Sequence, residues 1–290
     1  MTWHLVSDRA GRRPRQQGCA RYWRKIARVL AMVLAAGVVT QARAHPDLLA
    51  QIEILGDRLR ADPANAQLLL QRGDLYRRHQ DYKAAGRDLA AARRATPEDP
   101  LLDLYEGRLH LEMGDAEKAA SLLERYLSRE PEHALAWRLH GEALATAGRF
   151  QSAVASFGSA ISFSAHPGPE LFQWQVMTLL AARGPSSDAF VVIDSGLKRF
   201  GLEVTLLGLG VDLALSEGAT EQAEAYFALV PEGLVKLPTW QARLEALKCV
   251  QDSAADSRQA CRRSARSGLD AQRAAFEQRL RAARKIESPG

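Results

Sequence analysis

The sequence predicts an all-α protein in which pairs of helices repeat along the chain. Its 290 residues are 47% hydrophobic and 7% aromatic, and alanine and leucine, both strong helix formers, dominate the composition. No long run alternates apolar and polar residues in the way that a half-buried strand does. In addition, several kinds of residue recur at a fixed step of 34 residues, which is typical of a stack of helical repeats.

Four columns of residues keep this step over three successive copies, where a column is a position that recurs in each copy. Glycine, alanine, a large apolar residue and proline each occupy one column, and chance agreement in four columns does not explain the pattern. The columns are Gly73, Gly107 and Gly141; Ala85, Ala119 and Ala153; Leu89, Leu123 and Phe157; and Pro63, Pro97 and Pro131.

Each copy predicts two helices joined by a short turn. Gly114 and Gly148 stand in the turns, where a helix commonly ends in a left-handed residue, and the prolines stop each second helix. Gly107 lies inside a first helix at a cost of about 1 kcal/mol relative to alanine, so we expect it to permit close helix contact. The predicted first helices are 66–79, 100–113 and 134–147, and the predicted second helices are 83–96, 117–130 and 151–164.

This 34-residue pattern resembles the tetratricopeptide repeat. The second copy departs from the family's pattern at Asp103, where a bulky apolar residue is usual, and at His110, where an aromatic residue or leucine is usual. The resemblance covers about residues 46–231 and implies a right-handed α-solenoid with an extended concave face. The third copy is nearest to the consensus, with Trp137, Gly141, Leu144, Gly148, Ala153, Phe157 and Ala160.

The first 44 residues predict a secretory signal peptide. Basic residues precede an apolar run from Val29 to Val39, and Ala42-Arg43-Ala44 follows as a cleavage site. The run is too short to span a bilayer of about 30 Å, although an uncleaved anchor over residues 26–41 is the alternative. The leader carries a formal charge of +8, whereas the whole chain carries +5, so residues 45–290 carry −3. The basic pI comes from the leader and therefore does not indicate a nucleic-acid partner.

The remaining chain divides into a solenoid and a C-terminal segment. Cleavage after Ala44 would leave Cys249 and Cys261, and an even count favours a disulfide in an exported protein, with two buried free thiols as the alternative. The expected parts are a solenoid over 45–231 with a capping helix near its start, repeats at about 66–99, 100–133, 134–167, 170–203 and 204–231, and a C-terminal helical cap over 232–290 with helices at 238–250, 256–267 and 269–285.

No catalytic or cofactor-binding motif occurs in the sequence. It contains no G-x-S-x-G, no H-E-x-x-H and no phosphate-binding G-x-x-x-x-G-K, so we predict neither an enzyme nor a cofactor. Glu106, His110, Glu112 and Asp115 crowd one helix end, but they do not share one face, and we expect no metal site there. If His110 is buried at the helix interface, its partner should be Glu106 or a backbone carbonyl.

In the family that this chain resembles, the concave face of the first helices binds peptides or partner proteins. Transferred by register, this face combines apolar side chains with several arginines, so we expect a protein or peptide partner with apolar anchors and carboxylates. A solvated face without a specific partner is the alternative. The residues expected to line it are Leu70, Asp74, Arg77, Leu104, Arg108, Leu111, Arg138, Glu142, Trp174 and Thr178.

The sequence therefore predicts a non-catalytic scaffold, periplasmic or secreted, that binds a partner protein in its groove. It predicts no nucleic-acid partner, and no membrane association once the leader is cleaved. Two alternatives stay open. His45 at the mature N-terminus could bind copper together with its amine, which would suit a metal-binding or enzyme accessory protein. An uncleaved leader would instead give a membrane-anchored assembly subunit.

Overall fold

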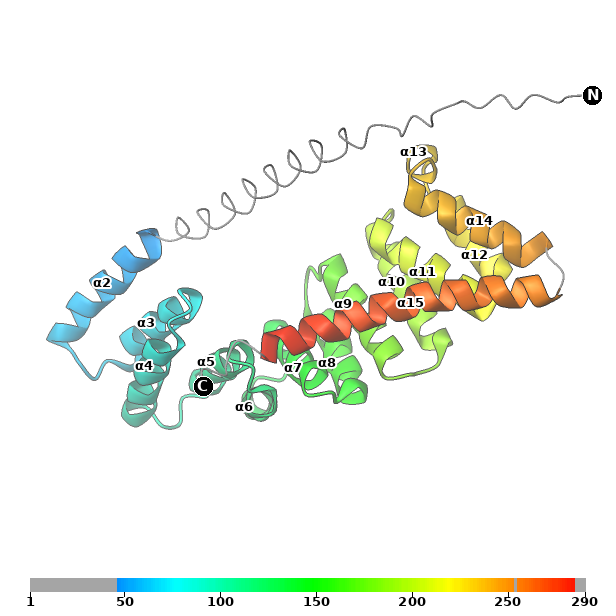
Figure 1. Cartoon of the computed structure of the whole chain (residues 1–290). Coiled ribbons are helices and arrows are strands. Elements are labelled where there is room, and N and C mark those ends of the chain that lie inside the picture. The colour runs from blue at the N-terminus through cyan, green and yellow to red at the C-terminus, as the bar shows by residue number, and fades with distance from the viewer. Residues whose placement is uncertain (1–45, 253–254, 285–290) are drawn as a thin grey trace, which may run out of the picture. The chain divides into compact units, whose positions relative to one another are not determined.

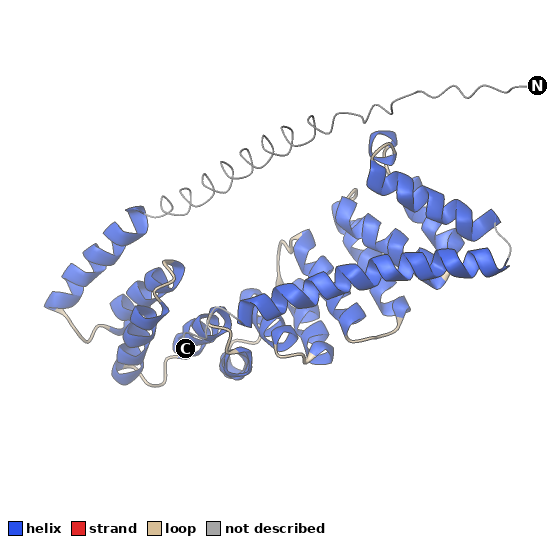
Figure 2. Cartoon of the chain, viewed as in Figure 1, coloured by secondary structure: helices blue, strands red, loops and turns tan. Residues whose placement is uncertain are grey.

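A computed structural model of the chain describes residues 46–252 and 255–284, and these residues form helices and short loops without a strand (Figure 2). The chain divides into two compact units, residues 1–54 and 55–290, and the described part of the first is the beginning of helix α2. The predicted signal peptide and His45 lie outside the described residues. Among the helices that are described, none is long and apolar enough to cross a membrane.

The predicted all-α fold of repeated helix pairs is confirmed (Figure 1). The boundaries of the three regular copies agree with the sequence to within one residue, because the 34-residue period fixes them. The helices are α2 (Pro46–Ala61), α3 (Ala66–Arg78), α4 (Tyr82–Ala95), α5 (Pro100–Glu112), α6 (Ala116–Arg129), α7 (Ala134–Thr146), α8 (Phe150–Phe163), α9 (Pro169–Ala181), α10 (Ser186–Phe200), α11 (Val204–Glu217), α12 (Thr220–Ala228), α13 (Glu232–Val235), α14 (Pro238–Asp252) and α15 (Ala255–Arg284).

The helix ends are set by local side-chain and backbone chemistry. Asn65, Asp99 and His133 each cap a first helix by accepting a hydrogen bond from a backbone N–H of its first turn, and Asp81 and Asp115 do the same for second helices. The turn within each pair contains one left-handed residue. These residues are Gln80 (φ 64°), Gly114 (φ 83°), Gly148 (φ 84°), Arg183 (φ 54°) and Gly218 (φ 74°).

The glycine column provides the close helix contact that the sequence predicts. A Cβ atom added to Gly107 would lie 2.8 Å from Leu123 Cγ, which is closer than van der Waals contact allows. Gly210 of α11 makes the same kind of contact with Tyr226, so this packing arrangement also occurs outside the three regular copies. The contacts pair Gly73 with Leu89, Gly107 with Leu123, Gly141 with Phe157, and Gly210 with Tyr226.

Asp103, which departs from the family's pattern, is explained by an ion-paired cluster. Its carboxylate is buried and accepts hydrogen bonds from Arg93 Nη2 at 2.7 Å and from Arg125 Nη2 at 2.5 Å. Arg93 also donates to Glu106 at 2.8 Å. The second repeat therefore uses charged groups that satisfy one another where the other copies use an apolar residue.

The C-terminal segment differs from its predicted form. The expected helices at 256–267 and 269–285 are one continuous helix, α15. The reason is that Gly268 does not adopt a positive φ, so it does not end the helix. Helix α14 packs on α11 and α12, whereas α15 turns back and contacts α11, α9, α7 and α5 in turn (Figure 1). A disulfide between Cys249 and Cys261 joins α14 to α15.

Candidate partner-binding groove

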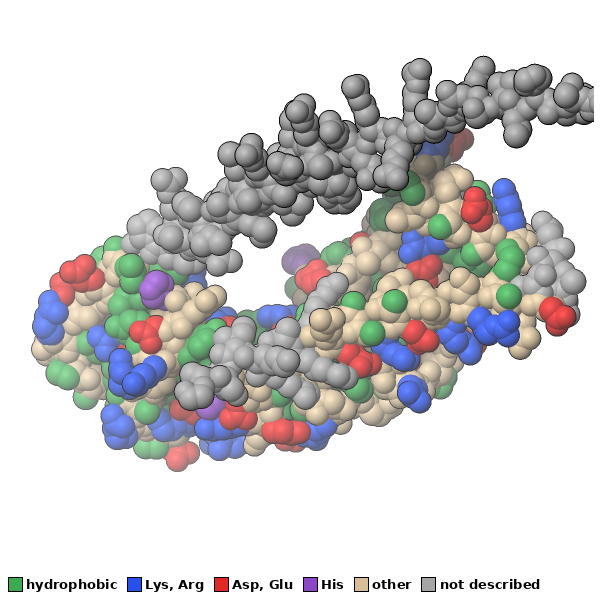
Figure 3. Space-filling model, in the orientation of Figure 1, with side chains coloured by type: hydrophobic (Ala, Val, Ile, Leu, Met, Phe, Trp, Pro, Cys, Tyr) green, Lys and Arg blue, Asp and Glu red, His purple; other side chains and the backbone are tan. Residues whose placement is uncertain are grey.

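The first helices of successive repeats form a groove, and α15 lies in it. A pocket of about 450 Å³ opens between α5, α7, α9 and the C-terminal half of α15, a volume sufficient for large side chains of a ligand. The space-filling view shows charged and apolar side chains close together along α15 (Figure 3). The pocket is lined by Arg108, Leu111 and Glu112 of α5; Arg138, Leu139, Glu142 and Thr146 of α7; Gln173, Trp174 and Met177 of α9; and Phe276 and Leu280 of α15.

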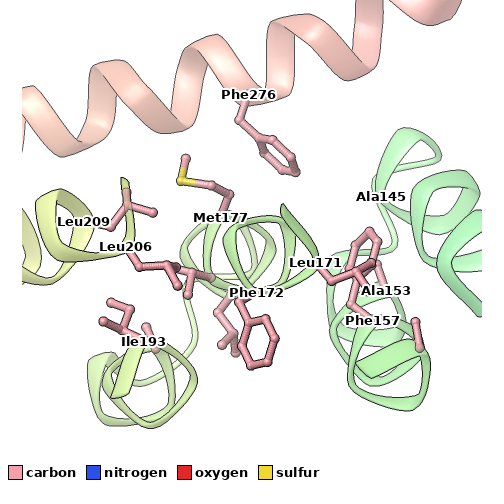
Figure 4. Close-up of a cluster of buried hydrophobic side chains, with 14 of the residues drawn as sticks. Ala145, Ala153, Phe157, Leu171, Phe172, Met177, Ile193, Leu206, Leu209 and Phe276 are labelled. Atoms are coloured by element: carbon pink, nitrogen blue, oxygen red, sulfur yellow. The ribbon is translucent and has the colours of Figure 1, made fainter. Parts of the chain in front are cut away.

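The floor of the pocket is apolar. We call its four side chains from the first helices, Leu111, Leu139, Trp174 and Met177, the apolar patch. The ring of Phe276 meets Trp174 edge to face, with 5.7 Å between the ring centroids and an interplanar angle of 85°. Figure 4 shows Phe276 projecting from α15 towards α9, where it joins the buried core of the neighbouring repeats.

A chain of ion pairs links α3 to α5 beside the pocket. Arg77 is buried and pairs with Asp74 at 2.8 Å (Nη2 to Oδ1) and with Glu112 of α5. Arg108 Nη1 lies 3.7 Å from the same Asp74 oxygen, so two guanidinium groups share one aspartate. Burial, together with the charge of Arg77, lowers the pKa of Arg108. Arg108 is therefore the groove arginine whose charge is least completely compensated.

Arg138 and Glu142 form a second ion pair, one helical turn apart on α7. Burial raises the pKa of Glu142, and Arg138 opposes this rise. All three arginines that the sequence assigned to the groove, Arg77, Arg108 and Arg138, thus lie within ion-pair distance of a carboxylate of this protein. A partner's carboxylate would have to replace one of these contacts, which weakens the expectation of an acidic partner.

The ten residues assigned to the groove from the sequence fall into three groups. Asp74 and Arg77 belong to the ion-pair chain next to the pocket. Leu70 and Leu104 are buried in the apolar core, and Thr178 is fully buried with its hydroxyl donating to a backbone carbonyl at 2.6 Å; none of these three lines the pocket. The remaining five line the pocket: Arg108, Leu111, Arg138, Glu142 and Trp174.

The register of α9 explains the position of Thr178. The pocket residues Arg138 and Glu142 correspond to Gln173 and Met177, a step of 35 residues. The prediction from the sequence used a step of 36 residues from Glu142, and this step leads to Thr178 instead of Met177. One extra residue lies in the loop before α9, and another lies in the turn after it, so the first and second helices of this repeat are shifted by different amounts.

Sequence reasoning missed the contribution of α15 to the pocket. Phe276 and Leu280 lie more than 100 residues beyond most of the side chains that they face. The only signal was the apolar spacing of Leu269, Phe276 and Leu280 within a helix that is otherwise rich in arginine and alanine. That spacing predicts a buried stripe, but it does not say which surface the stripe covers.

The polar cluster on α5 does not form a site. Glu106 pairs with an arginine of α4, and Glu112 with Arg77. The predicted partner of His110 was wrong: its Nδ1 atom is buried, lies 3.4 Å from Asp115 Oδ2, and lacks hydrogen-bond geometry. Burial is the main cause that lowers the pKa of His110. Within residues 46–252 and 255–284, no group of three or more His, Cys, Asp or Glu side chains could hold a metal ion.

Comparisons with known proteins agree with this architecture. The tetratricopeptide repeat family model matches residues 104–168, which include all of the pocket residues of α5 and α7. No curated protein matches the chain significantly.

Three solved structures are similar in fold. PilW, titled a widely conserved type IV pilus biogenesis factor, has a TM-score of 0.53 at 21% identity, over 76% of this chain and 97% of that chain. PilF of Pseudomonas aeruginosa has a TM-score of 0.52 at 16% identity, over 77% and 98%. A tetratricopeptide repeat protein from Parabacteroides merdae has a TM-score of 0.50 at 17% identity, over 83% and 92%.

At these identities the structural likeness shows the fold alone. The family match adds the repeat itself, in the part of the chain where the glycine and alanine columns are most regular. The helix pairs, their packing columns and the family match lead to one conclusion: the chain contains tetratricopeptide repeats, which the family model matches over residues 104–168.

Proposed function

We propose that this protein is an exported, non-catalytic scaffold that binds a segment of a partner protein in its groove. The observation that carries the proposal is the pocket between α5, α7, α9 and α15. It combines an apolar patch with charged side chains on its rim, which is the chemistry of a protein-binding site with a few apolar anchors.

The charges of the pocket suit binding better than catalysis. Glu112 and Glu142 are each paired with an arginine, so neither carboxylate is placed to take a proton from a substrate. The matching family is one of scaffolds for protein–protein interaction.

Export is supported by two features. Residues 1–44 have the order of basic, apolar and small residues that a secretory signal needs. The disulfide between Cys249 and Cys261 is typical of oxidising compartments. N-terminal sequencing of the native protein tests this part of the proposal: a mature chain that begins at His45 supports export by cleavage, and a retained Met1 contradicts it.

Site-specific cross-linking tests the groove. A photoreactive amino acid at Gln173, which lines the pocket, should capture a defined partner in cells that make the full chain. The matched control is the same amino acid at Val191, a 68% exposed position on the second helix α10. Capture of the same protein from both positions, or from Val191 alone, would contradict a groove site.

A matched pair of charge variants gives a second test. Arg108→Glu with Arg138→Glu reverses two charges on the rim of the pocket, and we expect it to change the yield of capture at Gln173, upwards for a basic partner segment and downwards for an acidic one. Arg87→Glu with Arg94→Glu makes the same change of charge on exposed positions of α4, and should leave capture intact. Circular dichroism verifies that both variants are folded.

A further inference from the structure

Helix α15 lies where a partner segment would bind, and its two halves are held differently. The first half is tied by the disulfide between Cys249 and Cys261. It also makes polar contacts with α11: Arg266 Nη2 donates to the carbonyl of Ser216 at 3.3 Å, and Gln272 Nε2 donates to Asp212 Oδ2 at 2.9 Å. A covalent bond and directional hydrogen bonds therefore fix this half in place.

The second half, residues 273–284, meets the first helices through apolar side chains. Phe276 packs on Trp174, and Leu280 lines the same pocket. The described ion pairs of Arg273 are with Asp270 and Glu277 of its own helix. The contacts with the groove are thus of a kind that another apolar side chain of similar size could replace.

The second half also covers charged groups. Arg108 and Glu142 line the pocket with Phe276 and Leu280, and burial shifts the pKa of each towards its neutral form. Keeping such groups from water costs free energy, and this free energy is recovered when the groups become solvated again. Displacement of this end of α15 would return the rim of the pocket to water, which offsets part of the free energy lost with the contacts of Phe276 and Leu280.

Charge indicates what kind of segment suits this groove. Residues 255–284 contain eight arginines and three acidic residues, a formal charge of +5. Residues 45–254 carry −8. The resident helix is therefore basic and amphipathic, with Phe276 and Leu280 one turn apart, and it lies on an acidic body.

We propose that the groove binds a basic amphipathic helix of a partner protein, which displaces residues 273–284 of α15 and places two apolar side chains on the apolar patch. The inference rests on the proposed function and names the partner's chemistry. It reverses the expectation drawn from the sequence, because the groove arginines are already paired and the surface continuous with the pocket already accepts a basic helix.

The test uses α15 itself as the probe. A fluorescent synthetic peptide of residues 268–284 is titrated onto the full chain and followed by anisotropy at low salt. We expect the peptide to bind weakly to the unaltered chain, whose groove is occupied by α15. It should bind at least about tenfold more tightly to the variant Phe276→Ala with Leu280→Ala, which we call the open variant, because apparent affinity rises with the fraction of molecules whose groove is free. Ala275→Ser with Gln278→Ser, at exposed positions of the same helix, should bind as the unaltered chain does.

Two altered peptides define the chemistry of the probe. One has alanine at the positions of Phe276 and Leu280, and the other has glutamate at its four arginines. Both should bind the open variant at least about tenfold more weakly than the parent peptide, since one apolar anchor pair or the complementary charge is lost. Equal binding of the glutamate peptide would overturn the basic partner.

Equal affinity of the parent peptide for the unaltered chain and the open variant would overturn displacement, as would no binding to either. Hydrogen exchange on the unaltered chain decides the matter if the variant does not fold: amides of residues 273–284 should exchange faster than those of 258–269, and equal protection contradicts the inference. A partner that is captured at Gln173 while α15 stays protected would keep the proposed function and overturn this inference alone.

Discussion

The three regular repeats and the C-terminal helix are held together in contrasting ways. In the repeats, each helix packs on its neighbours in the chain through a glycine or alanine of one helix and a large apolar residue of the next, as Gly141 and Phe157 do. Helix α15 instead reaches α11, α9, α7 and α5, held by one disulfide, a few polar contacts and an apolar stripe. The difference teaches that the same fold contains a rigid frame and a helix whose C-terminal half, residues 273–284, can be exchanged.

The largest expected effect compares two phenylalanines. Phe157 is fully buried between repeats, so Phe157→Ala should lower the free energy of unfolding by about 3–5 kcal/mol. Phe276 borders the pocket, and removing its ring can cost no more than the free energy that holds the end of α15 in place. Phe276→Ala should therefore lower the free energy of unfolding by less than half as much as Phe157→Ala does. Denaturant unfolding of both variants measures the two losses, and equal losses would mean that α15 belongs to the frame.

The disulfide provides the next test. It closes a short loop, with a sequence separation of 12, so Cys249→Ser with Cys261→Ser should cost about 3 kcal/mol in the loop-entropy description. We expect the loss to appear first as faster hydrogen exchange in residues 255–272, because the bridge ties this half to α14. Maleimide labelling of the unreduced chain that begins at His45, and so lacks Cys19, is the control, and two reactive thiols there would show that no bridge forms.

The contrast also explains what the sequence could predict. The first helix at 66–79 was placed to within one residue because its glycine, alanine and apolar columns repeat. The groove was only partly predictable: Arg108 and Glu142, 34 residues apart, both line the pocket, whereas Thr178 does not, since extra residues shift α9 and α10 by different amounts. Phe276 could not be assigned to the pocket from the sequence. Its contact with Trp174 joins residues that are far apart in the chain, and such a contact does not recur at a fixed spacing as the contacts of the repeats do.

A smaller effect probes the columns of the frame. Gly107→Leu forces a side chain against Leu123, where even a Cβ atom would lie at 2.8 Å, so we expect a loss of about 1–3 kcal/mol in the free energy of unfolding. The control is Gly233→Leu, since no heavy atom lies within 4 Å of a Cβ there, and its effect should stay within about 0.5 kcal/mol. If the two variants melt alike, close packing is not the reason for the glycine column.

The smallest effect asks whether α15 unfolds together with the frame. Gly268 is inside α15 with open space around a Cβ atom, so Gly268→Ala should stabilise this helix by about 1 kcal/mol. If α15 opens without the frame, hydrogen exchange in residues 258–272, which surround Gly268, slows while the denaturation midpoint of the whole chain stays nearly constant. If α15 is part of the frame, the midpoint rises instead. Faster exchange would contradict the open space at Gly268, because it would mean that an added methyl group disturbs the packing of the helix.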